Sequence, residues 1–373
     1  MLHTTLIINA GSSSLRFELF DAELNSLAKG HWDALDPEQK ATKTHAQAIE
    51  KALKSFSPQL LASIKQVGHR VVHGGEKYTK PTLINARVVA DLKKLSQLAP
   101  LHNPANIAGI EAAQKHLPKA KHYALFDTAF HSSLPQKAYL YGLPYSLYKK
   151  HGIRRYGFHG NSHAFLARTA EKILKKPGAK LVTCHLGNGV SLAAIRKGKS
   201  LDTSMGLTPL EGPIMGTRSG SLDPAILLYL MEQGYSTKKL THLLEKESGF
   251  LGVSGKNSDV RVLHAHPKDP GTQRSFDLFS YQISKLICSY FVPLQGLPEA
   301  IVFSAGIGEN AHYLRKQMCD ALKPFGLKLN AKANLQNQTL ISQPDSSIKV
   351  LVIPTEEAQQ MAHSLRVHAK GLR

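Results

Sequence analysis

Apolar and polar positions along this chain alternate between two periods, one typical of buried strands and one typical of helices. Short apolar runs bounded by glycine or polar turns predict strands, and they lie at residues 6–8, 65–72, 122–126, 181–186, 300–303 and 349–353. Longer segments with apolar residues at helical spacing predict helices, and they lie at residues 44–54, 88–97, 273–292, 309–322 and 356–368. This alternation predicts an α/β protein with mixed sheets flanked by helices.

Two further helix starts carry a polar residue followed by proline, a pair that favours the first turn of a helix. Asn103 and Pro104 predict a helix that begins with Asn103 as its cap and runs towards Leu117. Asp223 and Pro224 predict a second helix, which closes near a glycine ten residues further on.

Three predicted strands end in glycine turns of a shape that suits a phosphate group. Residues 6–17 and 181–192 each run strand, glycine turn, strand, and residues 300–310 run from a strand through Gly-x-Gly into a helical pattern. Glycine lets the backbone approach an anion, to which N–H groups and hydroxyls then donate. One such turn alone is no more than a hairpin, but the repetition predicts two related halves that face one nucleotide.

The repetition also predicts where the chain divides. We expect an N-terminal domain over residues 1–130 and a C-terminal, nucleotide-binding domain over residues 131–357. The last helix, over residues 358–373, is expected to return to the first domain.

Composition places the chain among ordinary globular proteins. With 373 residues the chain is long enough for two hydrophobic cores, and 42% hydrophobic and 20% charged residues are ordinary for a globular protein. The sequence shows no signal-peptide pattern and no apolar run long enough for a bilayer, so we expect no membrane partner. Cys184, Cys288 and Cys319 are widely spaced in apolar sequence, which favours reduced thiols and a cytoplasmic location.

The formal net charge of +20 favours an anionic partner. Lysine and arginine are scattered over helical segments such as 166–176 and 238–246, without the interleaved aromatic residues typical of single-strand binding. We therefore expect no nucleic-acid partner, and we interpret the excess charge as a source of solubility and of a general attraction for anions, which would also suit a small polyphosphate.

Charged and imidazole side chains lie where predicted strands and turns meet, and all of them except Asp127 have a glycine within two residues. They are Arg70, His73, Asp127, His159 and Arg218. Open α/β sheets bind ligands at the carboxyl ends of their strands, and glycine beside a charge suits a ligand that approaches closely. Taken singly, each residue is more often a helix cap or a satisfied buried side chain. Together they predict a site for an anionic ligand.

Several catalytic motifs are absent. The histidine pairs 69/73 and 159/163 have the spacing of zinc ligands on a helix, but neither has glutamate after the first histidine. Gly198-Lys199-Ser200 ends like a phosphate-binding Walker loop, but Ala193 replaces its first glycine. No G-x-S-x-G elbow occurs, which argues against a serine hydrolase.

Six segments resemble, in order along the chain, the motifs of the acetate kinases. They are Asn9–Ser14, Gly68–Gly75, Phe126–His131, Gly157–Gly160, His185–Gly189 and Gly306–Asn310, and residues 101–104 and 208–212 extend the resemblance. The resemblance implies two ribonuclease-H-like domains hinged around a nucleotide cleft, a fold shared with sugar kinases, actin-like proteins and chaperone ATPases. It also implies a homodimer that transfers a phosphoryl group reversibly from ATP to acetate with Mg²⁺, or Mn²⁺ as an alternative, giving acetyl phosphate and ADP.

The resemblance assigns the reaction to four residues: Arg70, Asp127, His159 and Arg218. Acetate is already ionised at neutral pH and needs no general base, so cations must instead offset the repulsion between two anions. The two arginines hold the carboxylate and then the transferring group, to which His159 donates. Asn9 and Glu357 serve the metal together with Asp127.

The remaining site residues form two sets that also rest on the resemblance. The acyl pocket beside Arg70 comprises Val72, Leu101, Phe158 and Pro209. The nucleotide contacts are Asn9, Ser12, Arg16, His185, Leu186, Gly187, Asn188, Gly189, Asp259, Val260, Arg261, Gly306, Ile307, Gly308, Glu309 and Asn310. His102 matches a family position near the site, without a defined role.

Several departures from the family pattern leave alternatives open, and the segment between residues 20 and 68 also looks shorter than is usual in the family. Arg16 stands where lysine or glutamate is usual, and Val260 replaces an aromatic residue that would flank the adenine. A shift of one residue would give the metal to Glu356 in place of Glu357. The alternatives to an acetate kinase are a propionate kinase of the same family and an ATPase of the actin or chaperone type.

Overall fold

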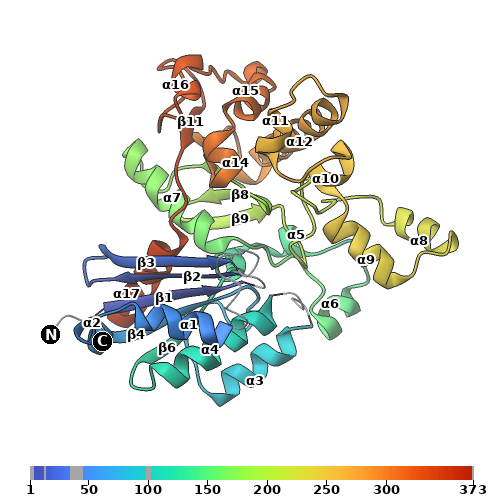
Figure 1. Ribbon diagram of the computed structural model, residues 1–373. Helices are drawn as coiled ribbons and strands as arrows, with labels where there is room; N and C mark the ends of the chain where they lie inside the picture. The colour runs from blue at the N-terminus through green and yellow to red at the C-terminus, as the bar shows by residue number, and fades with distance from the viewer. Residues whose placement is uncertain (1–3, 12–13, 34–44, 98–101, 372–373) are drawn as a thin grey trace. The chain divides into compact units, whose positions relative to one another are not determined.

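The computed structural model describes residues 4–11, 14–33, 45–97 and 102–371, and Figure 1 shows its helices and strands. The chain divides into two compact units. Unit 1 comprises Met1–Ser132 and Glu356–Arg373, and unit 2 comprises Ser133–Thr355. Each unit contains one mixed sheet flanked by helices, which confirms the predicted fold class. Within the described ranges, no helix has the length and apolar character that crossing a lipid bilayer requires.

The sheet of unit 1 has six strands in the order β3-β2-β1-β4-β6-β5. Their bounds are β1 Thr4–Ala10, β2 Ser14–Phe20, β3 Ser26–Asp33, β4 Ile64–Val71, β5 Thr82–Leu83 and β6 Lys121–Phe126. Strands β1, β2 and β3 form an antiparallel meander, and β1, β4 and β6 run parallel to one another. The carboxyl ends of β1, β4 and β6 therefore meet at one edge of the sheet.

The sheet of unit 2 has five strands in the order β11-β10-β7-β8-β9. Their bounds are β7 Leu181–Leu186, β8 Val190–Arg196, β9 Lys199–Thr203, β10 Ala300–Ser304 and β11 Lys349–Val352. Strands β7, β8 and β9 are antiparallel, while β7, β10 and β11 are parallel. This order and these directions repeat those of β1, β2, β3, β4 and β6, so the two sheets share one architecture.

Helices surround both sheets. Those of unit 1 are α1 His45–Lys54, α2 Pro58–Ser63, α3 Ala86–Leu95, α4 Asn103–His116 and α17 Glu357–Gly371. Those of unit 2 are α5 Gln136–Tyr139, α6 Tyr145–His151, α7 Gly160–Leu174, α8 Ala225–Glu232, α9 Thr237–Lys246, α10 Gly249–Ser254, α11 Val260–His264, α12 Pro270–Ser289, α13 Phe291–Leu294, α14 Ala305–Asn310, α15 His312–Asp320 and α16 Ala331–Leu335. The described residues also include 3₁₀ turns at Ala129–Ser133 and Lys323–Phe325.

Helices cover both faces of the unit 1 sheet, which explains why the first strand is a continuous apolar run. Leu6 and Ile8 belong to a buried cluster with residues of α1 and α4. Ile7 belongs to a different cluster, which includes Met361 and Leu365 of α17. Successive side chains of a strand point to opposite faces. Each of the three residues therefore has an apolar partner helix.

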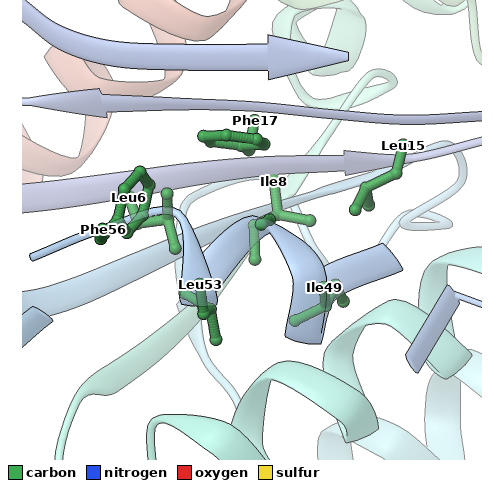
Figure 2. A pocket seen from close by; sticks show the side chains of 8 residues that line it. Leu6, Ile8, Leu15, Phe17, Ile49, Leu53 and Phe56 are labelled. Atoms are coloured by element: carbon green, nitrogen blue, oxygen red, sulfur yellow. The ribbon is translucent and has the colours of Figure 1, made fainter. Parts of the chain in front are cut away.

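A small cavity lies between the unit 1 sheet and α1, and Figure 2 shows the side chains around it. Its volume is about 10 Å³, and the lining side chains are Leu6, Ile8, Leu15, Phe17, Ile49, Ala52, Leu53 and Phe56. A site of that size has room for about one water molecule, and these side chains offer such a water no hydrogen-bond partner. The cavity is therefore a packing defect of the core and no ligand site.

The start of α4 differs from the prediction. Asn103 was expected to cap this helix, but the cap position belongs to His102, whose side chain makes no capping hydrogen bond. The amide of Asn103 bonds instead to His73, accepting from its N–H and donating to its carbonyl, each at 3.2 Å. Asn106 likewise accepts from the N–H of Val72 at 3.1 Å. A tertiary contact with the chain after β4 has replaced the local cap.

The helix predicted over residues 309–322 is wrong at its start. Strand β10 ends at Ser304, and α14 begins at the next residue, Ala305, whose φ of 63° turns the chain at once. Gly306 and Gly308 therefore lie inside a short helix rather than in a turn before one. Ala311 is not helical, and α15 follows it.

Candidate active site

Unit 1 gathers four of the predicted residues at the edge where its parallel strands end. Arg70 lies in β4 and Asn9 in β1, Asp127 follows β6, and Glu357 is the first residue of α17. We call these four residues the Arg70 cluster. Three neighbouring strands end side by side here, so residues distant in sequence meet.

Arg70 and Asp127 form a closely hydrogen-bonded ion pair. The Nε of Arg70 donates to both carboxylate oxygens of Asp127 at 3.0 Å, and its Nη2 donates to Oδ2 at 2.5 Å. Its Nη1 donates to Oδ1 of Asn9 at 3.3 Å. Burial alone would lower the pKa of Arg70, but the charges of Asp127 and Glu357 raise that pKa above its usual value. Arg70 is therefore a permanently charged, fixed cation.

Glu357 has a carboxylate oxygen that the protein leaves unsatisfied. Its Oε2 is buried without a hydrogen-bond partner and lies 3.9 Å from Nε of Arg70. Burial raises the pKa of Glu357, Arg70 and Arg16 oppose that rise, and the negative charge of Asp127 adds to it. An orphaned buried oxygen beside a second carboxylate fits a hard divalent cation, which would satisfy it.

The metal site would still need ligands from outside the protein. Among the described residues, no group of three histidine, cysteine, aspartate or glutamate side chains could hold a metal ion unaided. Mg²⁺ commonly takes one or two carboxylates and completes its shell with water and substrate phosphates. The donor set of Asp127, Glu357 and Asn9 therefore fits Mg²⁺ that arrives with a nucleotide.

Unit 2 brings His159 and Arg218 together at the glycine turn between β7 and β8. A Cβ atom on Gly189 would lie 3.3 Å from Nε2 of His159 and 3.5 Å from Nη1 of Arg218. His159 itself has a φ of 55°, left-handed backbone that costs a non-glycine residue about 1–3 kcal/mol. Such strain persists only where the surrounding structure enforces it, and it is typical of functional positions.

Arg218 is a half-buried cation that lacks a carboxylate partner. Its Nη1 donates to the carbonyl of Pro209 at 3.0 Å, and among the described residues it forms no salt bridge. Burial lowers the pKa of Arg218, and the charge of Glu245 only partly opposes that effect. Because arginine stays charged at neutral pH, this guanidinium fits an anionic ligand.

Asn188 lies in the turn at residues 187–189, and His185 lies in β7 just before that turn. The ring of His185 stacks on that of His159 with centroids 4.2 Å apart. The N–H of Gly216 donates to the carbonyl of Asn188 at 3.1 Å, and a Cβ on Gly216 would lie 2.0 Å from Oδ1 of Asn188. A side chain at position 216 would therefore displace the side-chain amide of Asn188, which glycine leaves in place.

The second and third predicted phosphate turns lie side by side. A Cβ on Gly187 would lie 3.5 Å from Cβ of Ala305, and one on Gly308 would lie 3.6 Å from Cβ of Leu186. Glu309 accepts from the N–H of Thr355 at 3.2 Å. Asn310 donates to the carbonyl of Gly306 in the same helix, at 2.9 Å, and Ile307 is half-buried within α14.

Of the other predicted residues, three lie apart from these places, two lie outside the described ranges, and Arg16 lies beside the Arg70 cluster. Asp259 caps α11 by accepting from the N–H of Arg261 at 2.8 Å, and the side chains of these two residues form an exposed ion pair. Val260, the residue between them in the sequence, is buried. Arg16 is exposed on β2, opposite Asn9 in the register. Ser12 and Leu101 lie outside the described residues.

The three described residues of the predicted acyl pocket are buried or half-buried. Val72 is buried in unit 1, while in unit 2 Phe158 is buried and Pro209 is half-buried. One histidine of each zinc-spaced pair contacts other protein side chains. His69 contacts His122, with Nε2 and Nδ1 3.0 Å apart, and His163 contacts Thr183 and Ser191.

Sequence reasoning missed a clamp that shapes the segment carrying Pro209. Glu211 accepts from Nη2 of Arg155 at 2.6 Å and from the hydroxyl of Tyr141 at 2.5 Å. Nη1 of Arg155 also donates to the carbonyls of Thr203, Ser204 and Met205. Glu211 lay within a motif that the resemblance included, but no sequence signal linked it to residues 56 and 70 positions away.

Known proteins match almost the full length of this chain. The profile of the Acetokinase family matches residues 4–363. Acetate kinase 1 of Vibrio cholerae serotype O1 is 44% identical over 386 residues, which cover 96% of each chain. A crystal structure of a propionate kinase from Francisella tularensis has a TM-score of 0.90 and 38% identity, covering 97% of this chain and 98% of that one. The acetate kinase of Porphyromonas gingivalis has a TM-score of 0.88 and 35% identity, with the same two coverages.

Proposed function

The chain belongs to the Acetokinase family, and we propose on that premise that it is an acetate kinase, which transfers the γ-phosphoryl group of ATP reversibly to acetate. The products are acetyl phosphate and ADP. The observation that carries this proposal is the half-buried guanidinium of Arg218, which has no carboxylate partner among the described residues and lies beside Gly189 and His159. A carboxylate and a phosphoryl group both match its planar fork.

The main obstacle to the reaction is electrostatic repulsion, because an ionised carboxylate must approach a phosphate that is also negatively charged. Arg218 offers one cation and Arg70 a second, which Asp127 holds in place. His159 donates to the transferring phosphoryl group. These charges are fixed before the reaction, so little reorganisation is needed as the transition state forms.

Asp127, Glu357 and Asn9 would hold Mg²⁺, which supplies positive charge to the phosphate oxygens when it is bound. The orphaned Oε2 of Glu357 supports Glu357 over Glu356, which is exposed. The same oxygen donors also suit Mn²⁺.

The nucleotide is proposed to bind along the joined glycine turns of unit 2. One part comprises Leu186, Gly187, Asn188 and Gly189, and the other is α14 from Gly306 to its last residue, Asn310. His185 lies beside the first part, and Ser12 and Arg16 are proposed to contact the phosphates from unit 1. The roles of Asp259, Val260 and Arg261 towards adenine stay predictions.

The acyl preference has a second candidate, because the solved propionate kinase is 38% identical with a TM-score of 0.90. One methylene group changes binding in an apolar pocket by only about 1–3 kcal/mol. Val72, Leu101, Phe158 and Pro209 are proposed to line a pocket of methyl size. Acetate is therefore the preferred substrate in the proposal, and propionate a poorer one.

A homodimer is proposed on the evidence of α8. None of its eight residues is buried, and Ile226, Leu228, Tyr229 and Met231 are 47–64% exposed. Exposed apolar surface of this kind is typical of interaction sites, and a second copy is the commonest partner in symmetric assemblies. The cytoplasmic location stays a prediction.

Trapping acetyl phosphate as its hydroxamate tests the function. Purified protein with ATP, Mg²⁺ and acetate should give the product, and a higher kcat/KM for acetate than for propionate. A higher value for propionate would favour the second candidate. ATP hydrolysis at the same rate without either acid would favour an ATPase of the actin or chaperone type.

A further inference from the structure

The two stacked imidazoles of unit 2 share one mode of support. Nδ1 of His159 lies 2.8 Å from the hydroxyl oxygen of Ser191, and Nδ1 of His185 lies 2.8 Å from that of Ser162. The opposite nitrogens border the glycine turn, because a Cβ on Gly189 would lie 3.3 Å from Nε2 of His159. Each ring therefore has a serine behind it and the turn in front of it.

The serine behind His159 belongs to a longer buried chain. Ser191 Oγ also lies 2.8 Å from Nε2 of His163, and Nδ1 of His163 lies 2.7 Å from Oγ1 of Thr183. Thr183, His163 and Ser191 are each 0% exposed, and they come from β7, α7 and β8. Three elements of unit 2 thus contribute to one series of contacts that ends at His159.

Two arrangements of this chain use every hydroxyl hydrogen within the chain itself. A hydroxyl carries one hydrogen, and a neutral imidazole carries one N–H and one acceptor nitrogen. In the first arrangement Thr183 donates to His163, His163 to Ser191, and Ser191 to Nδ1 of His159, so His159 carries its proton on Nε2. The second arrangement reverses every bond and leaves an unprotonated Nε2 facing the turn.

An anion at the turn favours the first arrangement, since only an N–H stabilises negative charge there. We propose that Ser191, His163 and Thr183 are positioning residues that hold His159 as the neutral tautomer protonated on Nε2, aimed at the transferring phosphoryl group. The proposal rests on the proposed function for the identity of that group. The residues act through His159 and are not expected to touch either substrate.

Thr183 offers the sharpest test, because Thr183→Val removes the hydroxyl and keeps the shape of the side chain. We expect kcat to fall about 10- to 100-fold, as is typical when the outer partner of a functional histidine is lost. The KM values for acetate and MgATP should change by no more than about twofold, because ground-state binding is untouched. Thr183→Ser restores the hydroxyl and should recover most of kcat.

The matched control is Thr4→Val. Thr4 is a buried threonine of β1 in unit 1, and its hydroxyl lies 3.0 Å from that of Ser63. This variant should keep the wild-type kcat. An equal loss of kcat in Thr4→Val and Thr183→Val would contradict the proposal, because it would show that any lost buried hydroxyl has this effect.

The tautomer can be measured without any turnover. Long-range proton–nitrogen correlation spectra of ¹⁵N-histidine protein, assigned with His159→Gln, should show the proton of His159 on Nε2 in the wild type. In Ser191→Ala the spectrum should change to a mixture of tautomers. A wild-type proton on Nδ1, or the same spectrum in Ser191→Ala, would overturn the proposal. Absence of acetyl phosphate from the wild type would instead refute the proposed function, so the two failures are distinguishable.

Discussion

At the scale of single residues, the two arginines of the proposed site differ in their pairing. Arg70 is bound by Asp127 through three hydrogen bonds, so much of its charge is neutralised before any ligand arrives. Arg218 forms no ion pair among the described residues and keeps its full charge. We infer that Arg218 contributes more to binding the carboxylate, whereas Arg70 chiefly orders its own cluster.

Glu357 provides the test of the metal site. Glu357→Gln removes one negative charge and should raise the Mg²⁺ concentration needed for half-maximal rate by about 10- to 100-fold. Initial rates over a Mg²⁺ titration give this value. The matched control is Glu356→Gln, at the exposed neighbour, which should behave like the wild type. A large effect in the control and none in Glu357→Gln would assign the carboxylate to Glu356.

The buried histidine pair of unit 1 predicts a pH dependence of stability. Burial lowers the pKa of His69 well below 6.5, the charge of His122 lowers it further, and burial also lowers the pKa of His122. Both pKa values are lower in the folded state, so the unfolded chain binds more protons below about pH 6.5. Stability should therefore be complete above that pH and decrease as the pH falls, by up to about 1.4 kcal/mol per pH unit for each histidine.

Urea unfolding between pH 8 and pH 5 measures this slope. His122→Gln should make it shallower, whereas His31→Gln, at an exposed histidine, should leave it unchanged. An unaltered slope in His122→Gln would mean that this pair does not control the acid response.

At the scale of elements, the clamp of Arg155, Glu211 and Tyr141 fixes the segment that carries Pro209. The hydroxyl of Tyr141 donates to Glu211 and accepts from the N–H of Leu207 at 2.9 Å. Tyr141→Phe removes both bonds and should cost about 1–3 kcal/mol of unfolding free energy. It should also raise KM for acetate several-fold, because Pro209 accepts a bond from Arg218.

Steady-state kinetics and urea unfolding of Tyr141→Phe check both effects. Tyr281→Phe is the matched control, because Tyr281 is 62% exposed, and it should match the wild type in both measurements. A stable Tyr141→Phe variant with unchanged KM would show that the clamp does not position Arg218.

Helix α8 carries the prediction about assembly. Leu228 is 64% exposed, and in the proposed homodimer it is buried against the second copy. Leu228→Asp would place a charge in that apolar contact and should convert the dimer to a monomer in sedimentation experiments. Val292→Asp, at an 80% exposed residue of α13, should leave the dimer intact. A wild-type monomer, or a Leu228→Asp dimer, would contradict the assignment of α8.

At the scale of the whole molecule, the sequence allowed the architecture to be predicted better than the pairing of side chains. Strand positions follow from apolar runs because β1 and β7 are buried, and the similar turns after them anticipated the shared order of the two sheets. The start of α14 was missed because Ala305 adopts a left-handed backbone that no local pattern announces. The contact of Asn103 with His73 was missed because it replaces a local cap.

The same contrast, between what a short segment predicts and what tertiary pairing adds, applies to the site residues. The sequence predicted Arg70, His159 and Arg218 from nearby glycines and family motifs, and it predicted Asp127 from its place at a strand end and a family motif, because these are properties of short segments. Their partners were not predicted, since Arg70 and Asp127 lie 57 positions apart and only the fold brings them together. The series of contacts from Thr183 to His159 was missed for the same reason, because it joins residues of different elements.

Arg218 is proposed to bind the carboxylate and the transferring group during phosphoryl transfer. This role is tested by kcat/KM for acetate in Arg218→Ala, measured with and without added guanidinium. Loss of one such donor should lower kcat/KM by about 10²- to 10³-fold, with MgATP binding largely kept. Guanidinium should restore part of the rate, because it supplies the missing charge. An Arg218→Ala enzyme with wild-type kcat/KM would contradict the account.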